Sequence, residues 1–241
     1  MTAPVTPPDI VHLAEVGSTN DWIAAAAARG DPDGLWVQAD IQTAGRGRRG
    51  RHWTSEGGNL FASTLVRPAA GEPPPQQLSF VAALALYDTA RAYIASERLS
   101  LKWPNDLMLD GIKCAGILVE GRDGCIIIGI GVNLSHHPEG TERPATSWPA
   151  RGVLAPPTRE VANGLARTFA ARRRQWRETG FAATRTDWLK QAHALGQQIE
   201  ARIGDETHVG IFETISDDGA LILNQGEAGR RLIHAGEVFG L

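Results

Sequence analysis

Two Asp-Gly turns between apolar runs constrain the fold more than any other feature of this 241-residue chain. The runs DLML and IKCAGILVE flank Asp110-Gly111, and CIIIGIGVNL follows the turn GRDG. Asp-Gly between apolar runs is a strong signal for a two-residue hairpin, because both turn positions require positive φ. We therefore expect an antiparallel meander across residues 101–134.

Helical patterns surround this meander. A helix is expected over 18–30, with Ser18 or Thr19 as its N-cap, and a second over 79–97. Further along, a third helix would place four large apolar side chains on one face, and a shorter helix follows around Trp188. The four side chains are Val161, Leu165, Phe169 and Trp176.

The sequence changes character at Gln197, where short strands alternate with tight turns. This spacing is typical of a small β-barrel. A core of about 45 residues is marginal alone, so we expect this part to pack against the first. The predicted fold class is α+β, with a mixed or antiparallel sheet flanked by helices over 1–195 and a small β-barrel over 196–241.

Composition excludes several classes of function. The 24 basic and 27 acidic side chains give a net charge of −3, with no general attraction to nucleic acid or membranes. No stretch approaches the roughly 20 apolar residues of a bilayer span, and MTAPVTPPDIV lacks the regions of a secretory signal. Two cysteines, Cys114 and Cys125, are too few for a disulfide framework. We expect a cytoplasmic protein with free thiols.

The segment QTAGRGRRGRHW contains a G-x-G-x-x-G at Gly45, Gly47 and Gly50. A dinucleotide-binding loop would open a helix and be followed by an acidic residue about 20 positions later. Here a strand-like run follows, and Glu72 lies among prolines, so that interpretation fails. A solvated basic loop and an Arg/Gly nucleic-acid-binding segment are alternatives. The direct continuation into Trp53, between two expected strands, argues against both.

Five motifs together resemble the catalytic domain of the biotin–protein ligases. In order they are STN at 18–20, QTAGRGRRGRHW at 42–53, KWPNDLM at 102–108, GIKCAGILVE at 111–120 and GIGVNL at 129–134. The later DDGALIL and AGEV resemble that family's SH3-like domain. The resemblance implies a catalytic domain like that of class II aminoacyl-tRNA synthetases, followed by an SH3-like β-barrel.

The resemblance also implies a reaction. Biotin and ATP, the latter with Mg²⁺, would give biotinyl-5'-AMP, and biotin would then pass to a lysine of a biotin carboxyl carrier domain. The carrier would belong to acetyl-CoA carboxylase or another carboxylase, and no bound prosthetic group is expected. We expect no DNA partner, because STN begins at residue 18 and leaves no room for a winged helix-turn-helix. No membrane partner is expected either, because no apolar stretch is long enough to span a bilayer. A lipoate–protein ligase and a nucleic-acid-binding module remain alternatives.

The chemistry explains the basic residues. Biotin's carboxylate must meet the α-phosphate of ATP, and two unit charges about 4 Å apart repel by about 4 kcal/mol at an effective dielectric of about 20. Cations at the meeting point offset this repulsion. By resemblance, Lys113, Arg46 and Arg48 are catalytic, and Asp106 is the candidate ligand for Mg²⁺, although Lys102 and Asp106 could simply pair.

Biotin and adenylate contacts follow from the same resemblance. Biotin-binding residues would be Ser18, Thr19, Asn20, Gln42, Gly45, Arg46, Gly47, Arg48, Lys113, Gly116, Ile117 and Leu118. ATP or adenylate would contact Arg48, Arg51, Trp53, Lys102, Asn105 and Asn133. Helix capping alone is the alternative for Ser18 and Thr19, and a strand-ending turn is the alternative for Asn133.

Overall fold

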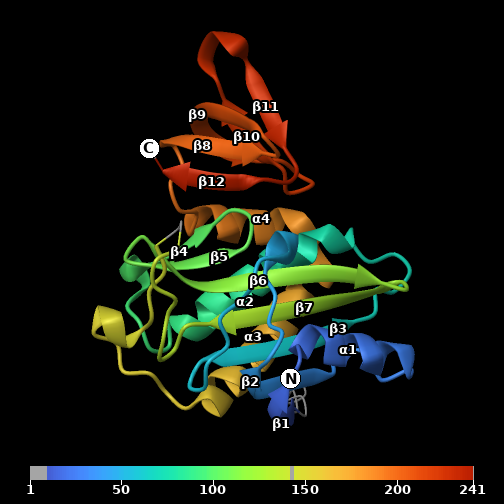
Figure 1. Cartoon of the computed structure of the whole chain (residues 1–241). Coiled ribbons are helices and arrows are strands. Elements are labelled where there is room, and N and C mark those ends of the chain that lie inside the picture. The colour runs from blue at the N-terminus through green and yellow to red at the C-terminus, as the bar shows by residue number, and fades with distance from the viewer. Residues whose placement is uncertain (1–9, 142–143, 241) are drawn as a thin grey trace.

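The computed structural model describes residues 10–141 and 144–240. Within these ranges a large sheet with its helices forms the lower part of Figure 1, and a smaller sheet lies above helix α4 (Phe181–Lys190). Residues 1–9, which carry most of the segment in which no secretory signal is expected, lie outside the described residues. No helix in the described part of the chain is long and apolar enough to cross a membrane.

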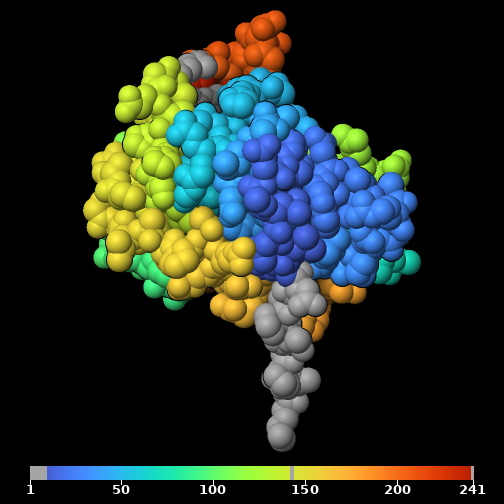
Figure 2. Space-filling view, turned by 60° about the horizontal axis from the view of Figure 1, so that its bottom comes forward, coloured from blue at the N-terminus to red at the C-terminus, as the bar shows by residue number. Residues whose placement is uncertain are grey.

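A seven-stranded mixed sheet forms the centre of the molecule. Its strands are β1 (Ile10–Val16), β2 (Trp36–Gln42), β3 (Leu60–Val66), β4 (Leu99–Lys102), β5 (Asp106–Leu109), β6 (Ile112–Arg122) and β7 (Cys125–Val132). Their order is β1-β2-β3-β7-β6-β5-β4, with β1 and β2 parallel and the other neighbours antiparallel. The edge strand β1, darkest blue in Figure 2, lies at the surface.

The predicted meander is confirmed over β4 to β7, whose strands pair in chain order. Asp110 and Gly111 have φ values of 51° and 76°, the paired positive angles of a type I′ hairpin. The β5–β6 register slips inside this hairpin. Leu107 pairs with Ala115 but Met108 pairs with Lys113, so the residue between them is a β-bulge.

Helices cover both faces of the large sheet. Helix α1 (Thr19–Ala28) packs Ile23 against Val37 and Leu65 on one face, and helices α2 (Leu78–Ala90) and α3 (Thr158–Thr179) cover the other (Figure 1). Short 3-10 helices are η1 (Arg48–Gly50), η2 (Pro75–Gln77), η3 (Ser96–Arg98), η4 (Pro149–Arg151) and η5 (Gly226–Ala228).

The second predicted helix is shorter than expected, because α2 ends at Ala90 instead of reaching residue 97. The chain turns after Arg91 in order to enter β4, which begins at Leu99. Ile94 nevertheless remains 3% exposed and packs in the core. Ile94 therefore fits the apolar pattern from which the helix was predicted, although it lies beyond the last residue of the helix.

The C-terminal strands form a second antiparallel sheet of order β11-β10-β9-β8-β12. They are β8 (Gln198–Ile203), β9 (Glu206–Ile215), β10 (Leu221–Asn224), β11 (Arg230–Ile233) and β12 (Glu237–Gly240). The predicted small, strand-rich C-terminal part is confirmed, but its sheet does not close into a barrel, because among the described residues β11 and β12 are edges that do not pair with each other. Packing of Phe212 on Trp188 of α4 covers the inner face without closure, their ring centres being 6.4 Å apart.

The two sheets share one apolar core, as the marginal size of the smaller part led us to expect. Phe80 of α2 contacts Trp188, and Trp103 Nε1 donates to the Gly219 carbonyl at 3.1 Å. Gly219 has φ 89°, and a Cβ there would stand 2.6 Å from the Phe80 ring. Close approach at this glycine brings the C-terminal sheet against the end of β4.

Candidate active site

A cavity of about 360 Å³ lies on the α1 face of the large sheet, over β6 and β7. Gly116 and Gly131 pair across these strands, and both lie beneath the ring of Trp53. A Cβ on Gly131 would stand 2.6 Å from that ring. The two glycines therefore leave a flat floor on which an aromatic ring or a flat apolar ligand can lie.

Nearly all the predicted site residues line this one cavity. They are Ser18, Thr19, Asn20, Gln42, Arg46, Gly47, Arg48, Arg51, Trp53, Lys102, Asn105, Asp106, Lys113, Gly116, Ile117, Leu118 and Asn133. Gly45 is the exception, because it does not border the cavity, and its contact with biotin stays a prediction. A Cβ at Gly45 would stand 2.8 Å from the Trp53 carbonyl, so this glycine permits close packing inside the arginine loop, which we define as residues 44–52.

A polar cradle closes one end of the cavity. We define it as Thr19, Asn20, Gln42 and Ser63. Gln42 Oε1 accepts the backbone N–H of Thr19 at 2.8 Å and its hydroxyl at 3.0 Å. Ser18 has the extended backbone of an N-cap, but its side chain makes no capping hydrogen bond. Ser18, Thr19 and Asn20 all border the cavity. Helix capping alone therefore does not describe their place in the structure.

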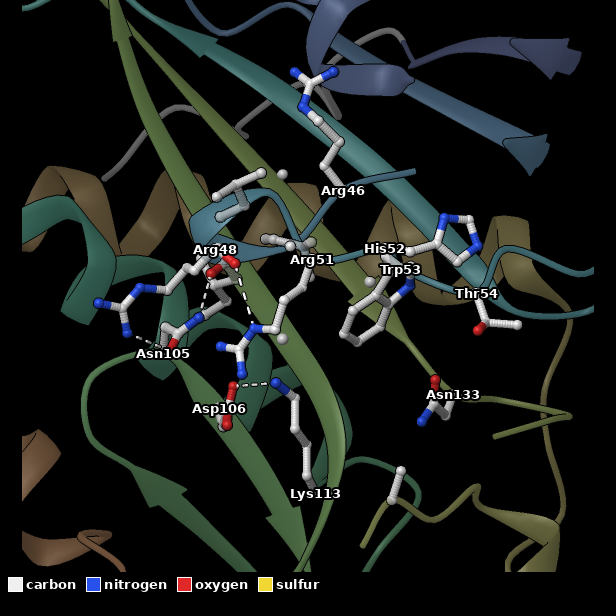
Figure 3. A pocket seen from close by; sticks show the side chains of 18 of the residues that line it. Arg46, Arg48, Arg51, His52, Trp53, Thr54, Asn105, Asp106, Lys113 and Asn133 are labelled. Atoms are coloured by element: carbon white, nitrogen blue, oxygen red, sulfur yellow. Dashed lines mark hydrogen bonds and ion pairs between the residues drawn. The ribbon is translucent and has the colours of Figure 1, made fainter. Parts of the chain in front are cut away.

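Lys113 and Asp106 point toward each other in the cavity (Figure 3), with 2.6 Å between Nζ and Oδ1. Asp106 is only 7% exposed, so the lysine compensates a carboxylate that has lost most of its hydration. Lys113 Nζ also lies 5.5 Å from the centre of the Trp53 ring system. The register slip between β5 and β6 lies directly beside this lysine.

The arginine loop touches three separate parts of the chain. Arg46 makes a two-fold hydrogen bond to Asp21 of α1 at 2.6 and 2.8 Å, and its guanidinium points away from the other labelled side chains in Figure 3. Glu120 of β6 lies 3.6 Å from the same guanidinium. The hydrogen bond from Arg46 lowers the pKa of the Asp21 carboxyl.

The other end of the arginine loop meets the C-terminal sheet. Arg48 Nη1 lies 3.3 Å from both Asn105 Oδ1 and the Gly236 carbonyl, and Arg51 forms an ion pair with Glu237. Burial lowers the pKa of the Arg48 guanidinium. Arg49 between them has φ 58°, a left-handed conformation within the short 3-10 turn.

Two asparagines hold the walls of the cavity together. Asn105 Nδ2 donates to the Ile117 carbonyl at 2.6 Å, and Asn133 Nδ2 donates to the Thr146 carbonyl at 3.0 Å. Asn133 is 3% exposed and borders the cavity. It therefore both ends β7, as a turn residue would, and faces the ligand space.

Cys114 is buried in β6, and His136 and His137 lie in the loop after β7. Burial raises the pKa of the Cys114 thiol to about 12, so the thiol is unreactive at neutral pH. His137 Nδ1 contacts Ser147 Oγ at 3.1 Å. Among the described residues there is no group of three His, Cys, Asp or Glu side chains able to hold a metal ion.

Several residues in the lining were not predicted. They are His52, Thr54, Phe61, Trp103, Pro104, Gly129, Ile130, Gly131, Pro138, Thr141, Ala145, Glu237 and Val238. The glycines of GIGVNL could have been found, because alternate glycines in a strand mark close approach on one face. Glu237 and Val238 gave no such signal, because their place depends on how the two sheets pack.

The cavity joins two chemical environments. One end carries hydroxyl and amide groups, and the other gathers Lys102, Lys113, Arg48 and Arg51. A ligand with a small polar head, an apolar body and an anionic tail fits this gradient. The basic end can hold a polyphosphate beside that tail and stabilise charge as the two react.

Comparisons with known proteins agree with this geometry. The model of the Biotin/lipoate A/B protein ligase family matches residues 18–133, and that of the Biotin protein ligase C terminal domain matches residues 194–240. A biotin–[acetyl-CoA-carboxylase] ligase of Paracoccus denitrificans is 44% identical over 239 residues, which cover 94% of this chain and 98% of the relative.

Two further similarities extend over most of the chain. A biotin–[acetyl-CoA-carboxylase] ligase of Mycobacterium tuberculosis is 37% identical over 238 residues, or 95% of this chain and 88% of the relative. The biotin protein ligase of Aquifex aeolicus, solved in complex with biotin and ATP, superimposes with a TM-score of 0.84 at 28% identity. That match covers 96% of this chain and 97% of the solved one.

Proposed function

This chain belongs to the biotin protein ligase family and is an ATP-dependent biotin ligase, and from this we propose how its cavity performs the reaction. The polar cradle receives the ureido head of biotin, and Gly116, Leu118 and Trp53 enclose its apolar body. The carboxylate tail then lies toward Lys113, among the basic side chains of the cavity.

The first step joins biotin to the nucleotide. A carboxylate oxygen of biotin attacks the α-phosphorus of ATP, a new phosphorus–oxygen bond forms, and pyrophosphate leaves with the electron pair of the broken bond. Lys113 and Arg48 stand at the basic end of the cavity and neutralise charge on the approaching groups. Asn133 borders the space for adenine. Positioning and electrostatics supply the catalysis, and no covalent enzyme intermediate forms.

Mg²⁺ would accompany ATP in this step. The lining supplies carboxylates from Asp106 and Glu237, and each is paired with a cation of the chain. Mg²⁺ is commonly held by one or two carboxylates together with substrate phosphates and water, which suits a site with a single inner carboxylate. Asp106 would hold the ion, whose charge would help to neutralise the phosphates.

The second step transfers biotin to protein. The amine of a lysine on a biotin carboxyl carrier domain, from acetyl-CoA carboxylase or another carboxylase, attacks the acyl carbon of biotinyl-5'-AMP. An amide bond forms, the amine loses a proton, and AMP leaves. A cytoplasmic location is part of this proposal, supported by the two buried, free thiols.

One observation carries the proposal: the polar cradle and the basic cluster open into the same cavity. Exchange of labelled pyrophosphate into ATP tests the first step alone. We expect exchange that depends on biotin and is absent with lipoate. Exchange driven by lipoate would make the chain a lipoate ligase, and no exchange with either acid would refute the proposed chemistry.

A further inference from the structure

Ser63 of β3 is the one member of the cradle that does not border the cavity. Its side chain is fully buried, and its hydroxyl oxygen lies 2.7 Å from both Thr19 Oγ1 and Asn20 Oδ1. Ser63 therefore touches two cavity residues that come from the start of α1. It is the one point in the cradle where these two side chains meet a common group.

Hydrogen bonds at both ends fix the direction of the cradle's amides. Gln42 Oε1 accepts the backbone N–H of Thr19, and Asn20 Nδ2 donates to Glu120 Oε2 at 2.6 Å. Turning the Gln42 amide would set its NH₂ group against that backbone N–H. Turning the Asn20 amide would set its oxygen against a carboxylate. Both amides therefore present oxygen to the hydroxyls between them.

The hydroxyl groups of the cradle supply fewer protons than its oxygen–oxygen contacts require. Oxygen–oxygen contacts run from Gln42 to Thr19, from Thr19 to Ser63, and from Ser63 to Asn20. Each of these three contacts needs one proton, and the two hydroxyls supply one each. Whichever way the hydroxyls point, one amide or hydroxyl oxygen of the cradle lacks its donor. A buried acceptor without a donor costs free energy until one is supplied.

Gly129 makes this arrangement rigid. It pairs with Ser63 across β3 and β7, and a Cβ at Gly129 would overlap the Asn20 amide. Asn20 thus lies directly on the backbone of β7, with Ser63 on one side and Glu120 on the other. A side chain at position 129 would displace the Asn20 amide from both partners.

We propose that Ser63 is a positioning residue for ligand binding, which holds Thr19 and Asn20 so that a donor-deficient oxygen faces the cavity. A ligand whose polar end donates an N–H supplies the missing hydrogen bond, whereas a ligand whose polar end carries acceptors alone leaves more oxygens without a donor. This inference rests on the proposed function, in which the cyclic urea of biotin supplies the N–H. It assigns no direct ligand contact to Ser63.

The test is a comparison of Ser63→Ala with Thr64→Val. Thr64 is equally buried on the same strand, but its hydroxyl donates to the Leu35 carbonyl at 3.0 Å, away from the cradle. Ser63→Ala should raise the biotin Kd and KM about tenfold, the effect of one or two hydrogen bonds, and change kcat by less than about twofold. Thr64→Val should lower the melting temperature about as much as Ser63→Ala does, but it should leave the KM for biotin unchanged.

A double-mutant cycle separates positioning from a general loss of stability. If Ser63 acts through its neighbours, Ser63→Ala should add less than about threefold to the biotin Kd in an Asn20→Ala background. Fully multiplicative effects, an unchanged KM in Ser63→Ala, or an equal rise in Thr64→Val would overturn the assignment. Failure of the wild-type protein to bind biotin at all would instead refute the proposed function.

Discussion

One extra residue in β6 decides where Lys113 lies. The register slip after Leu107 makes Cys114 the bulged residue, and this buried thiol is followed by Ala115 in the core. Lys113 lies just before the bulge, with its Nζ in contact with Asp106 and near Trp53. A motif can therefore identify the lysine, but its carboxylate partner follows only from the register of two strands.

Replacement of Lys113 by Ala should slow formation of biotinyl-5'-AMP by about a hundredfold or more, since loss of one preorganised charge costs about 3 kcal/mol in the transition state. The same change leaves Asp106 without its ion pair in a buried position, so a modest fall in melting temperature should accompany it. Single-turnover adenylate formation measures the rate. An additional Asp106→Asn substitution should recover stability but not rate, and a near wild-type rate in Lys113→Ala would remove this lysine from the mechanism.

At the scale of elements, the arginine loop is held by carboxylates of the chain itself. Asp21 of α1, Glu120 of β6 and Glu237 of β12 meet its guanidiniums. From the sequence alone, four arginines in one glycine-rich loop would repel each other, which predicts a loop that is mobile without ligand and orders around an anion. The partners could not be read from the sequence, because Asp21 and Glu237 lie 25 and 186 residues from the arginines they bind. Mobility of the ligand-free loop stays a prediction.

Asp21→Asn should loosen the anchor at Arg46 and let biotinyl-5'-AMP escape more often. The ion pair is half-exposed, and such pairs contribute about 0–1 kcal/mol, so release should rise no more than about fivefold. Labelling of lysines on added albumin measures the escape. Asp31→Asn is the matched control, because Asp31 pairs with Arg29 at the other end of α1. Equal labelling by the two variants would show that the Asp21 contact does not hold the loop.

Arg48→Gly should have a larger effect than Asp21→Asn. Arg48 borders the cavity and also contacts Asn105 and the Gly236 carbonyl, so its loss opens the basic end of the site to water and to foreign amines. We expect adenylate to form and then to biotinylate bystander proteins. Labelling restricted to the carrier domain would mean that the arginine is a binding contact and not part of a gate.

At the scale of the whole molecule, the two sheets act as one body. The sequence predicted that the C-terminal strands pack on the larger part, and aromatic contacts through Phe80, Trp188 and Phe212 confirm it. It did not show that Glu237 and Val238 complete the cavity, since the order of strands in the second sheet decides which edge faces the site. The boundary between 195 and 196 stays a prediction.

Trp188→Ala should lower the stability of both sheets together. The ring is fully buried between the sheets, and large-to-small changes of this kind cost about 3–5 kcal/mol. Calorimetry should show one transition moved to lower temperature, with adenylation lost at the temperature where it melts. Two separate transitions would mean that the C-terminal sheet folds independently of the large one.

Transfer of biotin to protein is measured directly by the intact mass of an apo carrier domain after incubation with this protein, biotin and MgATP. We expect addition of one biotinyl group to the single acceptor lysine, dependent on both biotin and ATP and much reduced in Lys113→Ala. An unchanged carrier mass, a lipoyl addition when lipoate is offered in place of biotin, or equal modification by Lys113→Ala would contradict it.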